Sequence, residues 1–323
     1  MKRRESARKT TKRKTLNREA TSVELRRLGT EKTNSASVDL DRKSALEIAR
    51  IINAEDAKVA AAVKGALRQI AEAIDLIAAA LAQGGRLIYV GTGTSGRIAA
   101  LDAVECPPTF DVDPRMVQFI IAGGPKALGA AVEADEDSRE LGREEIAKKK
   151  PTKKDVVVGI AASGRTPFTI AAIKYARAHG AKTVAVVSNP KSPLGKAAHV
   201  AIVADVGAEV VAGSTRMKAG TAQKMILNML STGAMTRLGY VYGNLMVNLH
   251  TKNEKLLERA VGILEEAAGL NHAAARKLLA AAGGRVTVAL VMSKAGVSRA
   301  RAAVALRESR GQVRRAIALA NPK

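Results

Sequence analysis

A glycine-rich loop, GTGTSG (91–96), follows a short apolar segment and precedes a helix-like run of residues. Its glycines match the G-x-G-x-x-G pattern of dinucleotide-binding loops, in which the start of a helix binds a pyrophosphate. Two features disfavour a dinucleotide here. The next apolar segment, VQFII (117–121), is followed by Ala-Gly-Gly and not by the acidic residue that binds a ribose hydroxyl. The hydroxyls of Thr94 and Ser95 add donors that suit a compact phosphate group.

A second loop of the same kind follows a later apolar segment. The sequence AASGRTPFT (161–169) carries Ser163, Gly164 and Thr166 directly after the run DVVVGI. Parallel strands end at the same edge of a sheet, so two such loops can converge on one phosphate monoester. The alternative is a pair of ordinary strand-to-helix turns whose hydroxyls cap helices. Because the two loops follow neighbouring strands, we favour the phosphate.

Five short segments rich in β-branched residues alternate with helical patterns across the centre of the chain. Nearly continuous apolar strands of this kind are typical of a parallel sheet buried on both faces. The alternation predicts an α/β fold with a doubly wound parallel sheet of about five strands. The expected strands are 87–90, 117–121, 155–160, 183–187 and 200–204.

Helical patterns surround these strands. Apolar residues at three- and four-residue spacing predict one long amphipathic helix over 54–83, which Gly84 and Gly85 end. After the glycine loop we expect a helix over 95–104, followed by a break at the prolines of ECPP (105–108). Further helices are expected at 126–134, 137–147, 167–178, 214–238 and 251–268.

The composition limits the classes of function. Aromatic residues make up only 2% of the chain, which argues against a stacking surface for single-stranded nucleic acid. The single cysteine, Cys106, excludes an intrachain disulfide framework and a CxxC metal site, and it fits a cytoplasmic protein. The longest uncharged apolar run, 76–82, is too short to span a bilayer, so we expect no membrane partner.

The net charge of +23 is concentrated at the two ends of the chain. Residues 1–27 carry 11 Lys and Arg against 3 acidic residues, and residues 271–323 carry 11 against one. We interpret 1–27 as a basic disordered arm that contacts nucleic acid only non-specifically, or as a solvated tail. Residues 278–290 and 305–317 resemble each other, which predicts a small helical domain of two repeats over 271–323. An interaction module and a passive lid both fit it.

Longer motifs narrow the interpretation. YVGTGTSGRIAALDAVECPPTF (89–110), GIAASGRTPF (159–168) and GSTRMKAGTAQKMILNMLSTGAM (213–235) resemble signature segments of the N-acetylmuramic acid 6-phosphate etherase family, as do TEKTN (30–34) and VYGNLMV (241–247). The family has a sugar isomerase (SIS) domain, which binds phosphosugars. The resemblance therefore implies a SIS catalytic domain over 28–270.

The resemblance also implies a reaction. The family cleaves the D-lactyl ether of N-acetylmuramic acid 6-phosphate and yields N-acetylglucosamine 6-phosphate and D-lactate during recycling of the bacterial cell wall. The route is elimination of lactate followed by addition of water, with no metal or redox cofactor, and the family is expected to form homodimers. The alternative is a non-catalytic SIS regulator that binds a sugar phosphate, similar to glucokinase regulatory proteins.

Two glutamates correspond to the catalytic pair of this family. We assign Glu105, in AVECPPTF, as the acid that protonates the lactyl oxygen, and Glu136, in AVEADEDS, as the base at C2 of the ring-opened sugar. Only the resemblance distinguishes Glu136 from its acidic neighbours. Arg216 and Lys218 are further candidates that could bind substrate anions such as the lactyl carboxylate, although a helix-surface role fits them equally. An acid–base pair favours the enzyme over the regulator.

Overall fold

The computed structural model describes residues 28–132, 135–249 and 253–321, so the basic arm expected at 1–27 lies outside the described residues. Its centre is a five-stranded parallel sheet in the order β2-β1-β3-β4-β5. The expected strands are confirmed to within one residue at each end. They are β1 (Leu87–Gly91), β2 (Val117–Ile121), β3 (Val156–Ile160), β4 (Lys182–Val187) and β5 (Val200–Val203).

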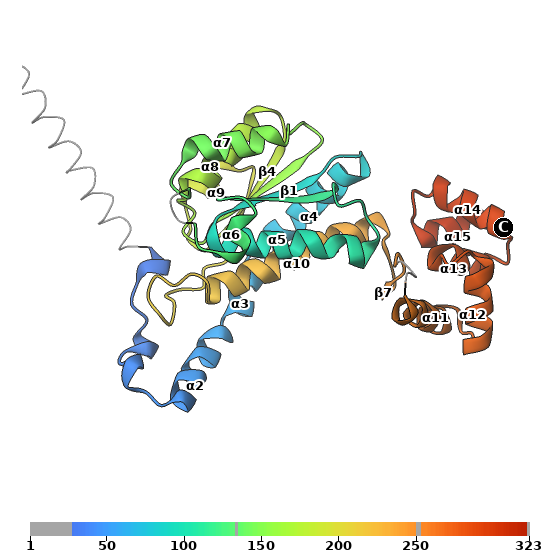
Figure 1. The fold of residues 1–323 in the computed structure, drawn as a ribbon, viewed down its shortest axis with the longest axis horizontal. Helices are drawn as coiled ribbons and strands as arrows, with labels where there is room; N and C mark the ends of the chain where they lie inside the picture. The colour runs from blue at the N-terminus through green and yellow to red at the C-terminus, as the bar shows by residue number, and fades with distance from the viewer. Residues whose placement is uncertain (1–27, 133–134, 250–252, 322–323) are drawn as a thin grey trace, which may run out of the picture.

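Helices cover both faces of this sheet (Figure 1). Alternate residues of β1 point to opposite faces, so Leu87 and Tyr89 enter one apolar core and Ile88 and Val90 enter another. The first core packs against α4 (Leu67–Ala82), α5 (Gly93–Phe110) and α10 (Lys218–Leu238). The second packs against α7 (Arg139–Lys148), α8 (Pro167–Ala178) and α9 (Pro193–Ala197). The doubly wound arrangement is therefore confirmed.

The chain crosses over at the strands that carry both loops. From β1 it runs to β2 on one side, and β3 then pairs with β1 on the other side. In the register, Gly91 lies opposite both Ile121 and Ile160, so these three strands end level with one another. Crevices at such crossover points are where open α/β sheets bind ligands.

The prediction of one long helix over 54–83 is wrong. The structure has α3 (Val59–Lys64) and α4, separated at Gly65 and Ala66, after α2 (Ala45–Asp56). Glycine is among the weakest helix formers, and the chain turns there. The segment before α2 forms three short 3₁₀ turns at Gly29–Glu31, Ser35–Ser37 and Leu40–Arg42.

Two further helices differ from the expectation. The expected break at ECPP does not occur, because α5 continues through Pro107 and Pro108 to Phe110. The burial of Cys106 and Phe110 in the first core holds this last turn in place although prolines disfavour a helix interior. The helix expected over 126–134 shortens to α6 (Lys126–Gly129).

The C-terminal helices form a third apolar core beyond the end of α10 (Figure 1). A short hairpin of β6 (Val241–Tyr242) and β7 (Leu245–Met246), which we did not expect, leads to it. The segment for which we predicted two helical repeats contains four helices, and α11, which we assigned to the large domain, packs with them. The five are α11 (Glu254–Ala268), α12 (His272–Ala281), α13 (Val286–Ala295), α14 (Arg299–Glu308) and α15 (Val313–Ala320).

Within the described ranges, no single helix has the length and apolar character needed to cross a membrane. Helices α12 and α13 reach that length and apolar character only when they are taken together, and the chain bends by 107° between them.

Candidate active site

The glycine loop brings the start of α5 against the sheet. A side chain at Gly96 would place its Cβ 2.5 Å from Ile121 Cγ1 of β2, so only glycine allows this approach. Gly93 has a φ of +49°, which favours glycine. The N-cap residue, Thr92, makes no side-chain capping hydrogen bond within the described chain. The first N–H groups of α5 are therefore available to an anion.

The two predicted loops meet in one pocket of about 340 Å³. The glycine loop contributes Thr94 and Ser95, and the second loop contributes Ser163 and Thr166. Gly164 does not line the pocket. It has a φ of +65° and packs tightly against Ser192, so its part is to shape the turn. Hydroxyls and helix N–H groups converging at one place suit a phosphate monoester.

Glu136 lies in the same pocket. A Cβ added at Gly93 would lie 3.1 Å from Glu136 Oε1, which puts this carboxylate beside the first turn of α5. The carbonyl of Glu136 accepts a hydrogen bond of 3.1 Å from Phe168 N at the start of α8. Its described acidic neighbours, Asp135 and Asp137, do not line the pocket. The geometry therefore separates Glu136 from Asp135 and Asp137, which the residue types alone could not do.

Glu105 lies elsewhere. It is exposed on α5, twelve residues after Gly93, which corresponds to roughly 18 Å along the helix axis. It does not line the pocket. Its neighbours Leu101 and Val104 are exposed apolar side chains, 48% and 56% accessible. A single chain thus does not bring Glu105 and Glu136 together.

Lys218 does not fit the expected substrate contact. Its side chain is only 2% exposed and its Nζ lies 2.6 Å from Glu55 Oε2. The N–H groups of Lys218 and Ala219 both donate to the buried carboxylate of Glu209 at the start of α10. Hydrogen bonds from Lys218 and then from Lys58 lower the pKa of Glu55 to about 2. An ammonium group already paired in the interior anchors α10 and is not available to a ligand.

The nearby loop reaches the pocket through other residues. Arg216 is exposed and lies outside the pocket lining, whereas Gly213 and Thr215 line it. The signature segment that contains Arg216 and Lys218 therefore shapes the pocket with its small residues.

Glu31 is a pocket residue that the sequence analysis missed. The buried Thr30 next to it accepts a hydrogen bond of 3.1 Å from Asn189 Nδ2. A Cβ added at Gly213 would lie 3.5 Å from Glu31 Oε2, so the carboxylate lies over that loop. Glu31 belongs to the motif TEKTN, which resembles a signature segment of the family, but the resemblance assigned no role to this residue. Among the described residues, two carboxylates line the pocket, Glu31 and Glu136, and they come from distant parts of the chain.

A buried polar network holds α5 against the sheet and α10. Tyr89 Oη donates to Asp102 Oδ2 over 2.8 Å, and Ser231 Oγ donates to Asp102 Oδ1 over 2.9 Å. Burial raises the pKa of Asp102 to about 6, although both hydrogen bonds oppose the shift. Burial also raises the pKa of the neighbouring Cys106 thiol to about 12, so this thiol is no nucleophile at neutral pH.

This network predicts a pH-dependent stability. The pKa of Asp102 is about 6 in the folded chain, whereas an aspartate in the unfolded chain has a pKa of 3.8. The folded state therefore binds the proton more tightly. Its stabilising contribution is complete below pH 3.8 and is lost as the pH rises through 6. Asp102→Asn removes this pH dependence, so the parent chain loses stability relative to the variant as the pH rises. The free energy of unfolding of the variant minus that of the parent chain should rise by roughly 2 kcal/mol between pH 4 and pH 8. Urea denaturation at both pH values measures it, with Asp41→Asn on the exposed N-terminal segment as control. If the free energies of unfolding of Asp102→Asn and of the parent chain change equally with pH, the prediction is wrong.

Parts of the chain match two family models. A model of the glucokinase regulatory protein N-terminal SIS domain matches residues 69–177, and a SIS domain model matches residues 148–233. A solved phosphoheptose isomerase from Francisella tularensis has a TM-score of 0.49 and 17% identity, covering 60% of this chain and 100% of that chain.

Relatives of known name match much more of the sequence. An N-acetylmuramic acid 6-phosphate etherase from Clostridium beijerinckii is 48% identical over 296 residues, which cover 92% of this chain and 97% of that protein. One from Symbiobacterium thermophilum is 56% identical over 276 residues, which cover 85% and 91%. These identities, over most of each chain, show that the protein belongs to the N-acetylmuramic acid 6-phosphate etherase family.

Proposed function

We propose that the protein is a carbon–oxygen lyase that cleaves the D-lactyl ether of N-acetylmuramic acid 6-phosphate in cell-wall recycling. Family membership supports the substrate. The observation that carries the chemistry is the position of Glu136, a carboxylate in the pocket where two hydroxyl-bearing loops meet the start of α5.

The proposed reaction starts from the ring-opened sugar, whose C1 aldehyde makes the C2 proton acidic. The phosphate binds the N–H groups of α5 and the hydroxyls of Thr94, Ser95, Ser163 and Thr166. The Glu136 carboxylate takes the C2 proton, the C3–O bond to lactate breaks, and an acid protonates the departing oxygen. Water then adds to the resulting double bond at C3, and N-acetylglucosamine 6-phosphate and D-lactate are released.

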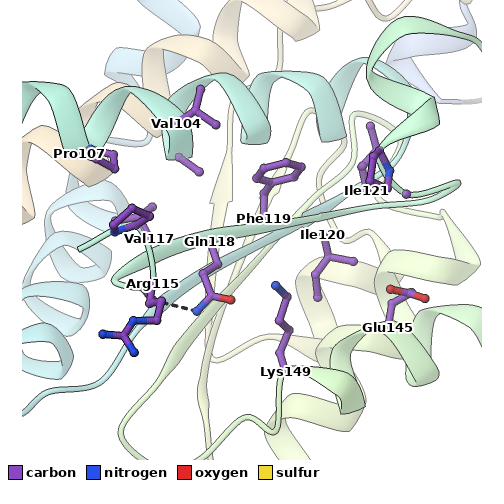
Figure 2. A pocket seen from close by; sticks show the side chains of 14 residues that line it. Val104, Pro107, Arg115, Val117, Gln118, Phe119, Ile120, Ile121, Glu145 and Lys149 are labelled. Atoms are coloured by element: carbon purple, nitrogen blue, oxygen red, sulfur yellow. Dashed lines mark hydrogen bonds between the residues drawn. The ribbon is translucent and has the colours of Figure 1, made fainter. Parts of the chain in front are cut away.

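We assign the acid to Glu105 of a second copy of the chain in a homodimer. Glu105 lies outside the pocket of its own chain, and the surface around it is suited to a partner. The edge strand β2 has one unpaired side, and a groove of about 710 Å³ runs along it. Figure 2 shows Val104 and Pro107 of α5 beside this strand, with Phe119 on it. Packing of two copies here would cover the apolar side chains next to Glu105.

We also propose the cytoplasm as the site of action, where a single thiol stays reduced. Non-specific contact with nucleic acid through the basic ends of the chain stays a prediction.

The direct test is to incubate the purified protein with N-acetylmuramic acid 6-phosphate and measure D-lactate. We expect stoichiometric release of D-lactate and N-acetylglucosamine 6-phosphate. The alternative, a non-catalytic sugar-phosphate regulator, predicts binding of the phosphosugar without any lactate. N-acetylmuramic acid without the phosphate is the control substrate, and its turnover at the same rate would contradict the phosphate pocket.

A further inference from the structure

The hydroxyl of Ser95 contacts a buried amide behind the phosphate pocket. Ser95 Oγ lies 3.0 Å from Gln223 Oε1 of α10. Gln223 is only 2% exposed, and its Nε2 has no hydrogen-bond partner among the described residues. Helix α10 lies close to the first turn of α5 here, since a Cβ at Gly220 would lie 3.5 Å from Thr94 Cγ2.

This arrangement conflicts with phosphate binding by Ser95. If the hydroxyl donates to Gln223 Oε1, it has only lone pairs to offer, and a phosphate dianion needs donors. The amide nitrogen is then a buried donor without a partner, which is rare in folded proteins.

A rotation of the Gln223 amide by 180° resolves both conflicts. It exchanges the oxygen and the nitrogen without moving any other atom. Nε2 then donates to Ser95 Oγ, and the hydroxyl proton is free to point into the pocket. The unpaired amide group becomes the oxygen, and under-satisfied carbonyls are more common in interiors than unpaired N–H groups.

We propose that Gln223 is a positioning residue that sets the direction of the Ser95 hydroxyl. Its amide N–H occupies a lone pair of Ser95 Oγ, so that the Ser95 proton is donated to the phosphate of the bound sugar. Gln223 itself does not touch the substrate. This inference rests on the proposed phosphate pocket and adds to it the residue that orients one of its donors.

The matched substitution is Gln223→Glu, which replaces the amide donor by an acceptor of the same shape. The introduced carboxylate draws the Ser95 proton away from the pocket. We expect the affinity for N-acetylglucosamine 6-phosphate, measured by titration calorimetry, to fall roughly 10- to 100-fold, as for loss of one charge-assisted hydrogen bond. Gln69→Glu makes the same chemical change on the exposed face of α4 and should leave the affinity unchanged.

A double-mutant cycle separates orientation from simple charge repulsion. Ser95→Ala should weaken binding by a similar factor, and Gln223→Glu added to Ser95→Ala should then cost less than about threefold. Equal losses in both backgrounds would mean that the carboxylate acts by its charge alone, and this would overturn the proposal, as would an unchanged affinity of Gln223→Glu. Thermal unfolding confirms that each variant is folded.

The same measurements keep this inference distinct from the proposed function. If the parent chain binds N-acetylglucosamine 6-phosphate no better than N-acetylglucosamine, the phosphate pocket is wrong. If it binds the phosphosugar tightly and the cycle shows no coupling, only the role of Gln223 is wrong.

Discussion

Glu136→Gln is expected to lower kcat for D-lactate release by roughly 10²- to 10⁴-fold, which is the usual contribution of a general base. An amide cannot accept the C2 proton. The substitution keeps the side-chain shape, and the backbone contact of Glu136 with Phe168 does not involve the side chain. The affinity for N-acetylglucosamine 6-phosphate and the melting temperature should therefore change little. Steady-state D-lactate assays measure kcat, and calorimetry measures the affinity and the melting temperature.

Exchange of the C2 proton with solvent tests whether Glu136 removes that proton. In D₂O the parent enzyme should incorporate deuterium at C2, and Glu136→Gln should lose this exchange together with turnover. Asp135→Asn, a neighbouring carboxylate that does not line the pocket, is the matched control and should retain both. Normal turnover by Glu136→Gln would remove this residue from the mechanism.

The second large effect concerns Glu105 and the homodimer. Glu105→Gln alone should be nearly inactive, because the departing lactyl oxygen loses its proton donor. Mixing it with Glu136→Gln and allowing the subunits to exchange should restore about a quarter of the parent activity. Half of the dimers are then mixed, and each mixed dimer has one site in which both glutamates are intact.

This recovery depends on the placement of Glu105 in the partner's site. If both glutamates acted in the same chain, no mixture of the two variants would contain an intact site, and the mixture would stay inactive. Size-exclusion chromatography of each variant confirms that the dimer forms. Glu105→Gln should still exchange the C2 proton if proton removal precedes loss of lactate.

The sequence was informative about local structure and about features that repeat along it. The strands and both hydroxyl-bearing loops could be predicted because each depends on neighbouring residues and on the register of parallel strands. Glu136 could be assigned only by resemblance, because its acidic neighbours carry the same pattern. The structure then separates Glu136 from Asp135 and Asp137 through its position beside the first turn of α5.

Contacts between distant segments could not be predicted. Lys218 pairs with Glu55 across 163 positions of sequence, and no local pattern indicates that this lysine turns inward. Glu31 reaches the pocket because Thr30 is bound by Asn189, 159 positions away. The prolines after Glu105 disfavour a helix locally, yet α5 continues through them to Phe110, which is buried in the first core.

The missing side chain at Gly93 has a consequence for engineering this fold. In a dinucleotide-binding loop the second glycine makes room for a pyrophosphate, whereas here the carboxylate of Glu136 stands 3.1 Å from the place where a Cβ would be. The same small volume therefore admits either a cofactor phosphate or the Glu136 carboxylate, and not both. Converting such a loop from one use to the other requires rebuilding the segment that carries Glu136, and transplanting the glycine pattern alone would change nothing.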